Sequence, residues 1–190
     1  MKPVNELVEF LKTAFEKAGF EKAVIAMSGG VDSSTSAALT VRALGAANVY
    51  PLLLPYKNLN SAVDAQEITD QLKIPKENVK MIDIQPLVDP IASLDPGMDQ
   101  IRRGNIMARV RMVVLFDWAK KENALVIGTE NRTEHLLGYY TRFGDEGSDI
   151  EPLRNLYKTQ VYELARSLGI PDKIMSKPPT AGLWQGQTDE

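Results

Sequence analysis

The chain has 190 residues, of which 44% are hydrophobic and 25% charged, with a formal net charge of −3. We expect a single globular domain over residues 1–190, because this length can bury a sizeable core. The slight acidity and the lack of a long basic run argue against nucleic acid as a partner. The apolar stretches are too short to span a membrane and the charged N-terminal segment is not a signal peptide, so we expect no membrane partner.

The sequence contains no cysteine. This excludes disulfides, zinc sites built on thiolates and a cysteine nucleophile. The absence also fits a cytoplasmic protein, which is the location that we expect.

Helical and strand patterns alternate along the chain. Apolar residues at helical spacing predict helices, and short apolar runs predict buried strands. In chain order we expect a helix over residues 4–18, a strand over 23–27, a helix over 33–44, a strand over 49–54, a helix over 62–72, a strand over 79–84, a long helix over 99–121, a strand over 124–127 followed by a short helix, a short fifth strand over 150–153 and a helix over 158–168.

This alternation is typical of an α/β fold. We expect a doubly wound, five-stranded parallel sheet of order 3-2-1-4-5 with helices on both faces. In such sheets ligands bind beyond the carboxyl ends of the strands, where the strand order reverses. That switch point should lie between the strands that end at Met27 and Gly128, and unusual residues follow both.

The long helix over 99–121 is apolar on two sides. One stripe runs through Ile101, Ala108 and Leu115, and a second runs through Ile106 and Val113. A helix of this kind is expected to be buried on both sides. A symmetric homodimer through the helix would cover the apolar surface that one sheet cannot.

The first strand runs into the sequence Ser28-Gly29-Gly30-Val31-Asp32-Ser33-Ser34. Two glycines allow a sharp turn that brings backbone N–H groups close to an anion, and the following helix presents its N-terminus. The loop lacks the Gly-Lys-Ser/Thr of a Walker A motif. An acid in a phosphate cradle would repel the ligand, so Asp32 suggests a bridging Mg²⁺. The alternative is an ordinary helix N-terminus with Asp32 as an early acidic residue.

Residues 28–34 resemble the signature of the PP-loop (N-type) ATP pyrophosphatases, whose fold is similar to the adenine nucleotide alpha hydrolases. Members of that superfamily split ATP between the α and β phosphates. The resemblance implies that ATP is a co-substrate. It also implies contacts to ATP from Ala26, Met27, Ser28, Gly29, Gly30, Val31, Asp32, Ser33 and Ser34.

Four further stretches and the chain end resemble the ammonia-dependent NAD synthetases within that superfamily. They are residues 105–112, 128–134, 138–145, 177–184 and 186–190. The resemblance implies a ligase of NAD biosynthesis that amidates deamido-NAD with ammonia through an acyl adenylate, converting ATP to AMP and pyrophosphate. Its partners would be these substrates and a second copy of the chain, since the family forms homodimers.

The same resemblance implies roles for four residues near ATP. Thr129 contacts the adenosine, Glu134 holds Mg²⁺ together with Asp32, and Lys158 and Thr180 contact ATP, Lys158 at the phosphates. Asp32, Glu134 and Lys158 would then be the catalytic residues. Without the family, the favoured readings would be a solvated helix carrying Glu130 and Glu134, a helix-terminal surface lysine for Lys158 and a turn residue for Thr180.

For the second substrate the sequence offers a polar pair on the long helix. Asn105 and Arg109 are four residues apart on one face, and an arginine fork suits phosphate or carboxylate. In an apolar helix two such residues are hard to explain as surface positions alone. The resemblance implies a deamido-NAD site made of Asn105, Arg109, Phe116, Arg142, Asp145 and Asp149, with the last three in a glycine-rich loop that closes over substrates.

The chain departs from the family pattern at several positions. Arg142 stands where many relatives carry lysine, Phe116 where some carry tyrosine, and Leu53 where some place an ATP-contacting arginine. His135, next to Glu134, is expected to pack or lie at the surface. Relatives continue for some tens of residues beyond the position of Glu190, so we expect a C-terminal continuation.

Two rival functions remain open from the sequence. The ATP-pyrophosphatase subunit of GMP synthetase shares the loop but lacks the motifs of residues 128–134 and 138–145. A non-catalytic adenine-nucleotide sensor would not need both Asp32 and Glu134. A glutaminase domain or a thiolase that depends on a persulfide would need a cysteine, so ammonia should be free or come from another protein.

Overall fold

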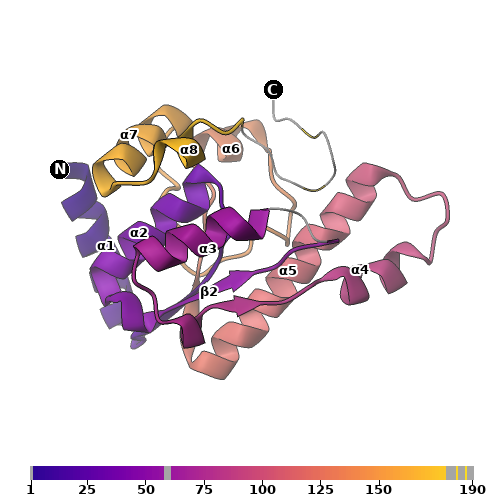
Figure 1. Ribbon diagram of the computed structural model, residues 1–190, viewed down its shortest axis with the longest axis horizontal. Coiled ribbons are helices and arrows are strands. Elements are labelled where there is room, and N and C mark those ends of the chain that lie inside the picture. Colours follow the sequence, from indigo (N-terminus) through magenta and orange to yellow (C-terminus); the bar gives the residue numbers. More distant parts are fainter. Residues whose placement is uncertain (1, 58–60, 179–182, 184–186, 188–190) are drawn as a thin grey trace.

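The computed structural model describes residues 2–57, 61–178, 183 and 187 (Figure 1). The helices are α1 (Lys2–Ala18), α2 (Val31–Leu44), α3 (Ser61–Gln71), α4 (Gln85–Ala92), α5 (Gln100–Glu122), α6 (Arg132–Leu137), α7 (Lys158–Leu168) and α8 (Asp172–Met175). The strands are β1 (Lys22–Ala26), β2 (Val49–Leu53), β3 (Lys80–Met81) and β4 (Ala124–Ile127). Two 3₁₀ turns, η1 (Ala46–Asn48) and η2 (Lys76–Asn78), precede β2 and β3.

The described strands form one parallel sheet in the order β3-β2-β1-β4. The parallel sheet and the expected order of the first four strands are therefore confirmed. The prediction of a fifth strand over residues 150–153 was wrong, because this segment pairs with β4 only through a single bridge between Ile127 and Ile150. Pro152, which lacks a donor N–H, follows at the start of a turn, and the pairing cannot extend.

Helices cover both faces of the sheet, as Figure 1 shows. In β1 alternate residues point to opposite sides, so Ala23 and Ile25 join one core while Val24 joins the other. The first core includes residues of α1, α2, α3 and α7, such as Phe15 and Leu39. The second core is formed with α4 and α5. This arrangement leaves the carboxyl ends of β1 and β4 at one edge.

Helix α5 lies along the second face and presents a mixed surface. Its buried residues include Met107, Ala108 and Leu115. The other apolar stripe is only partly covered in the single chain, since Val113 is 60% exposed. Ile101, at the start of the helix, is 64% exposed. Ala108 and Leu115 of the first stripe are therefore buried, whereas Ile101 of that stripe and Val113 of the second stripe leave apolar surface exposed.

Among the described residues, no helix combines the length and the apolar character needed to cross a membrane.

Candidate active site at the switch point of the sheet

A cavity of about 750 Å³ opens where the strand order reverses. β1 lies between β2 and β4, so the chain segments that leave β1 and β4 diverge at this point. The cavity walls come from the loop after β1, the end of β2, one side of α5, the segment after β4, and the start of α7. The structure therefore has a cavity at the position where the sequence predicts the ligand site.

The serine hydroxyl groups of the loop after β1 form hydrogen bonds within the loop. Gly29 has a φ of 81°, a conformation that residues with a side chain rarely adopt. The hydroxyls of Ser33 and Ser34 donate to the carbonyl of Gly30 at 3.2 and 2.7 Å, and Ser28 Oγ lies 3.0 Å from Ser33 Oγ. Gly30 caps α2 without a side-chain acceptor. The first turn of α2 lines the cavity without a side-chain cap on its N–H groups, an arrangement suited to an anion, and we call it the anion cradle.

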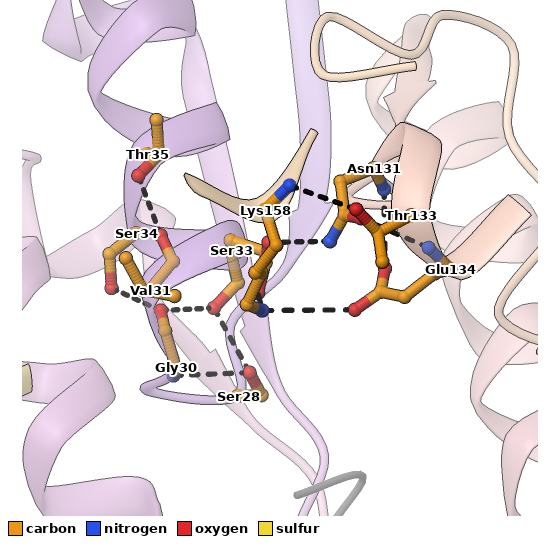
Figure 2. Close-up of polar contacts among 11 residues, drawn as sticks. Ser28, Gly30, Val31, Ser33, Ser34, Thr35, Asn131, Thr133, Glu134 and Lys158 are labelled. Carbon is orange, nitrogen blue, oxygen red and sulfur yellow. Dashed lines mark hydrogen bonds and ion pairs between the residues drawn. The ribbon is translucent and has the colours of Figure 1, made fainter. Parts of the chain in front are cut away.

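Three charged side chains meet beside this cradle. Asp32 comes from the first turn of α2, Glu134 from α6, and Lys158 from the first residue of α7. Lys158 Nζ bonds Asp32 Oδ2 and lies 3.8 Å from Glu134 Oε1. Figure 2 shows Lys158 between the residues of the loop and those of α6. Thr133 Oγ1 accepts the backbone N–H of Lys158 at 3.0 Å, which fixes the start of α7 against α6.

The burial of the site and the closeness of its charges shift the pKa values of Glu134 and Lys158. Burial, and then the negative charge of Asp32, raise the pKa of Glu134 to about 7, although Lys158 opposes both effects. Burial acts to lower the pKa of Lys158, but the attraction of Asp32 and Glu134 prevails and raises it. The pair of carboxylates is therefore stabilised by a cation.

The chemistry of this pair fits Mg²⁺. The side chains of Asp32 and Glu134 are 18% and 28% exposed, so both can reach a ligand in the cavity. Mg²⁺ is usually held by one or two carboxylates together with waters and substrate phosphates. Within the described ranges no three acidic or histidine residues form a cage for a metal. The residues therefore fit a metal shared with a phosphate ligand.

The residues expected at the second substrate divide into two groups. Asn105 and Asp145 line the cavity, and Thr141 joins them. Its hydroxyl donates to Asn105 Oδ1 at 2.8 Å and its backbone N–H donates to Asp145 Oδ1 at 2.9 Å. Burial raises the pKa of Asp145.

The second group lies outside the lining of this cavity. The exposed Arg109 side chain donates through Nε to the carbonyl of Arg142 at 3.3 Å, so these two residues are neighbours. Asp149 Oδ2 accepts the N–H of Val126 in β4 at 2.8 Å. Phe116 packs beside the core formed with α5.

Of the remaining predicted ATP contacts, Thr129 lines the cavity directly after β4. Thr180 lies outside the described residues. The predicted site residues that also line the cavity are Ala26, Met27, Ser28, Gly29, Gly30, Val31, Asp32, Ser33, Glu134 and Lys158.

Sequence reasoning passed over Arg111. This side chain lines the cavity, and its Nε donates to the carbonyl of Leu54 at 3.1 Å. Burial lowers its pKa to about 10, against a smaller effect of Asp145. The available signal was an arginine between the apolar positions Val110 and Met112 of a helix. The guanidinium of Arg111 is thus a positive group at the cavity in addition to Lys158 and Lys177.

Sequence reasoning also passed over the environment of Glu130. Only 5% of this residue is exposed and it lies before α6, whereas the alternative reading placed it with Glu134 on a solvated helix. Its Oε2 pairs with Arg154, and His135 Nδ1 lies 3.5 Å from its Oε1. Arg154 also bonds Glu151 Oε2 at 2.8 Å. This network ties the segment after β4 to the turn that follows Ile150.

The parallel sheet, the glycine–serine loop and the charged cluster define a nucleotide-binding α/β domain with a PP-loop at its switch point. The sequence model for NAD synthase matches residues 3–190. The chain therefore belongs to the NAD synthase family.

Known relatives cover nearly all of the chain. It is 48% identical over 188 residues to the NH(3)-dependent NAD(+) synthetase of Fusobacterium nucleatum subsp. nucleatum, covering 98% of this chain and 72% of the relative. Identity to the enzyme of that name from Pyrococcus furiosus is 47% over 190 residues, covering 100% of this chain and 71% of the relative.

Solved structures show the same fold. An NMN synthetase from Francisella tularensis superposes with a TM-score of 0.91 at 39% identity, covering 99% of this chain and 78% of that one. The NH3-dependent NAD synthetase of Campylobacter jejuni gives a TM-score of 0.86 at 33% identity, covering 92% of this chain and 75% of that one.

Proposed function

We propose that this protein is an ATP-dependent ligase that converts deamido-NAD to NAD with ammonia as the nitrogen donor. The observation that carries the proposal is the meeting of Asp32, Glu134 and Lys158 beside the anion cradle, in a chain whose relatives include NH(3)-dependent NAD(+) synthetases. The two relatives, which the chain covers to more than two thirds of their length, are named NH(3)-dependent, and this supports ammonia as the donor.

The reaction has two steps. A nicotinate carboxylate oxygen attacks the α-phosphorus of ATP, and the bond to the bridging oxygen breaks with release of pyrophosphate. Ammonia then attacks the carbonyl carbon of the acyl adenylate, AMP leaves with the former carboxylate oxygen, and a proton is lost from nitrogen. Adenylation supplies the leaving group that a carboxylate lacks. The protein chiefly positions two anions and balances their charge.

Each part of the ATP site has a role in this proposal. The N–H groups at the start of α2 and the loop over residues 28–34 hold the phosphates that leave as pyrophosphate. Thr129 contacts the adenosine portion, and Lys158 balances charge on the phosphates. Thr180 is proposed as a further ATP contact. A Mg²⁺ ion held by Asp32 and Glu134 would neutralise phosphate charge when bound.

The second substrate is proposed to extend from the cavity over the side of α5. Asn105 and Asp145 line the cavity itself, whereas the exposed Arg109 is available to an anionic group outside it. The assigned set remains Asn105, Arg109, Phe116, Arg142, Asp145 and Asp149. We further propose a homodimer in which the exposed apolar side of α5 is covered, and a cytoplasmic location.

A second acid substrate has a specific observation in its favour. The similar Francisella tularensis structure is named an NMN synthetase. The acid that corresponds to NMN is nicotinate mononucleotide, which carries the same reactive carboxylate without the adenylate half of deamido-NAD. It would undergo the same two steps at the same residues.

The test is a comparison of acids at equal concentration with ATP, Mg²⁺ and ammonium. Deamido-NAD, nicotinate mononucleotide and xanthosine monophosphate would each be assayed for AMP and for their amidated or aminated product. We expect the largest kcat/KM for deamido-NAD. A larger value for nicotinate mononucleotide would move the assignment to NMN synthesis, and product from xanthosine monophosphate alone would refute the proposal. ATP binding without turnover of any acid would favour the sensor function.

A further inference from the structure

Asn131 lies between the two carboxylates of the site and contacts both. It is fully buried at the N-cap of α6. Its side-chain nitrogen donates to Asp32 Oδ1 at 3.0 Å, and its side-chain oxygen accepts the backbone N–H of Glu134 at 3.1 Å. Its own backbone N–H donates to Glu134 Oε2 at 3.2 Å. One residue thus connects α2 and α6 across the switch point (Figure 2).

These bonds divide the four carboxylate oxygens into two kinds. Asp32 Oδ1 and Glu134 Oε2 are held by Asn131. The other oxygens, Asp32 Oδ2 and Glu134 Oε1, face the same ammonium group of Lys158. The two oxygens that Asn131 leaves unoccupied therefore converge on one positive charge.

A carboxylate that has one oxygen held cannot rotate freely, so the direction of its other oxygen is set. Partners of this kind orient the groups that bind a metal and raise affinity without touching the metal. We propose that Asn131 is a positioning residue that sets the spacing and orientation of Asp32 and Glu134 for a shared divalent cation. The inference rests on the metal role proposed above for these two carboxylates.

Helix capping alone does not account for the contacts of Asn131. The cap of α6 requires only an oxygen that accepts the N–H of Glu134, and serine provides such an oxygen. The bond from the amide nitrogen to Asp32 contributes nothing to the cap. Asn131→Ser keeps the cap and removes this bond, so the variant separates the two roles. Asn131→Thr also keeps a capping hydroxyl and fills more of the space, which guards against loss of folding.

The experiment measures how strongly a cation tightens nucleotide binding to the full chain. Calorimetric titration with α,β-methylene-ATP, which cannot be cleaved at the reacting bond, gives a Kd in EDTA and a second Kd with Mn²⁺. The ratio of the two reports the metal site without dependence on deamido-NAD. We expect Asn131→Ser and Asn131→Thr each to reduce this ratio roughly 10–100-fold, the usual effect of losing such a partner.

A second buried asparagine provides the matched control. Asn78, in the turn before β3, is 7% exposed, and its amide nitrogen donates at 2.9 Å to the carbonyl of Ala47, in the turn before β2, and at 3.3 Å to that of Val49, the first residue of β2. Asn78→Ser should lower the Tm and leave the ratio of Kd values unchanged. A loss of ratio in this control equal to that in Asn131→Ser would refute the inference.

Asp32→Ala separates this inference from the function on which it rests. We expect this variant to lose the effect of Mn²⁺ on nucleotide affinity. An unchanged ratio in Asp32→Ala would refute the metal role and the role of Asn131 together. A loss in Asp32→Ala with an unchanged ratio in both Asn131 variants would refute the role of Asn131 alone.

Discussion

Gly128 directly follows β4, at a point where an added side chain would force its neighbours to move. A Cβ atom built there would lie 2.6 Å from both Glu151 Cγ and Ser148 Oγ, and 2.9 Å from Ser148 Cβ. The Glu151 side chain cannot easily move away, because it accepts from Ser148 and from Arg154. The backbone N–H of Gly128 also donates to the carbonyl of Ile150 at 2.8 Å. Gly128→Ala must therefore push residues 148–151 away from β4.

The expected cost of this displacement is that of overpacking, about 1–3 kcal/mol of unfolding free energy. For a domain of this size that corresponds to a fall in Tm of roughly 2–12 °C. Activity should fall more steeply, because Thr129 follows Gly128 at the cavity and a displacement of about 1 Å can cost roughly 100-fold in rate. Urea unfolding and steady-state kinetics measure the two effects.

Two further variants make the reasoning refutable. At Gly97 an added Cβ would meet its nearest atom, Asp95 Oδ1, at 3.4 Å, so Gly97→Ala should be nearly neutral. Ser148→Gly in the Gly128→Ala background removes two of the three close atoms and should restore part of the stability. Equal stability of Gly128→Ala and Gly97→Ala, or no recovery in the double variant, would contradict the account.

Three other predictions concern the charged groups of the cavity. Because burial and then Asp32 raise the pKa of Glu134 from 4.5 to about 7, the folded ligand-free protein retains a proton that the unfolded chain loses, and stability falls as the pH rises through this window. Glu134→Gln should therefore show a smaller fall in Tm than the wild-type protein between these pH values. An identical dependence of Tm on pH in the two proteins would refute the role of Glu134 in this pH dependence. Lys158→Met should lower kcat roughly 100–1,000-fold, as expected for the loss of a group that stabilises transition-state charge, and an unchanged kcat would contradict this. Arg111→Met should reduce kcat/KM for one anionic substrate roughly 10–100-fold, the worth of a hydrogen bond to a charged group. A variant with the kcat of the wild-type protein and with the wild-type KM for each substrate would exclude Arg111 from substrate binding.

The fold could be read from the sequence where one pattern dominated. The apolar runs of β1, β2 and β4 and the periodicity of α5 and α7 each gave the type of element that the structure contains. Helix α4 was not predicted, because Pro86 and Pro90 lie within its eight residues and proline argues against helix. Pro86 is nevertheless in the first turn, where no intrahelical donor is lost.

The site could be predicted where its residues are local in sequence. The glycines and serines after β1 and the adjacent Asp32 form a recognisable segment. The sequence analysis did not single out Asn131 and Glu134 as a capping box, although Asn-x-x-Glu is a signal for the start of a helix and the structure forms this cap. The bond from Asn131 to Asp32 could not be read, since it joins residues 99 positions apart. The burial of Arg111 likewise depends on the packing of α5 against the end of β2.

The central claim is that the nicotinate carboxylate attacks the α-phosphorus of ATP. The direct measurement uses deamido-NAD with both carboxylate oxygens labelled with ¹⁸O, followed by mass spectrometry of the products. Formation of an acyl adenylate and its attack by ammonia must transfer one ¹⁸O to AMP and leave one in the amide of NAD. Asp32→Ala should form neither labelled product. Unlabelled AMP from the wild-type protein, with ¹⁸O in phosphate or pyrophosphate instead, would contradict the account.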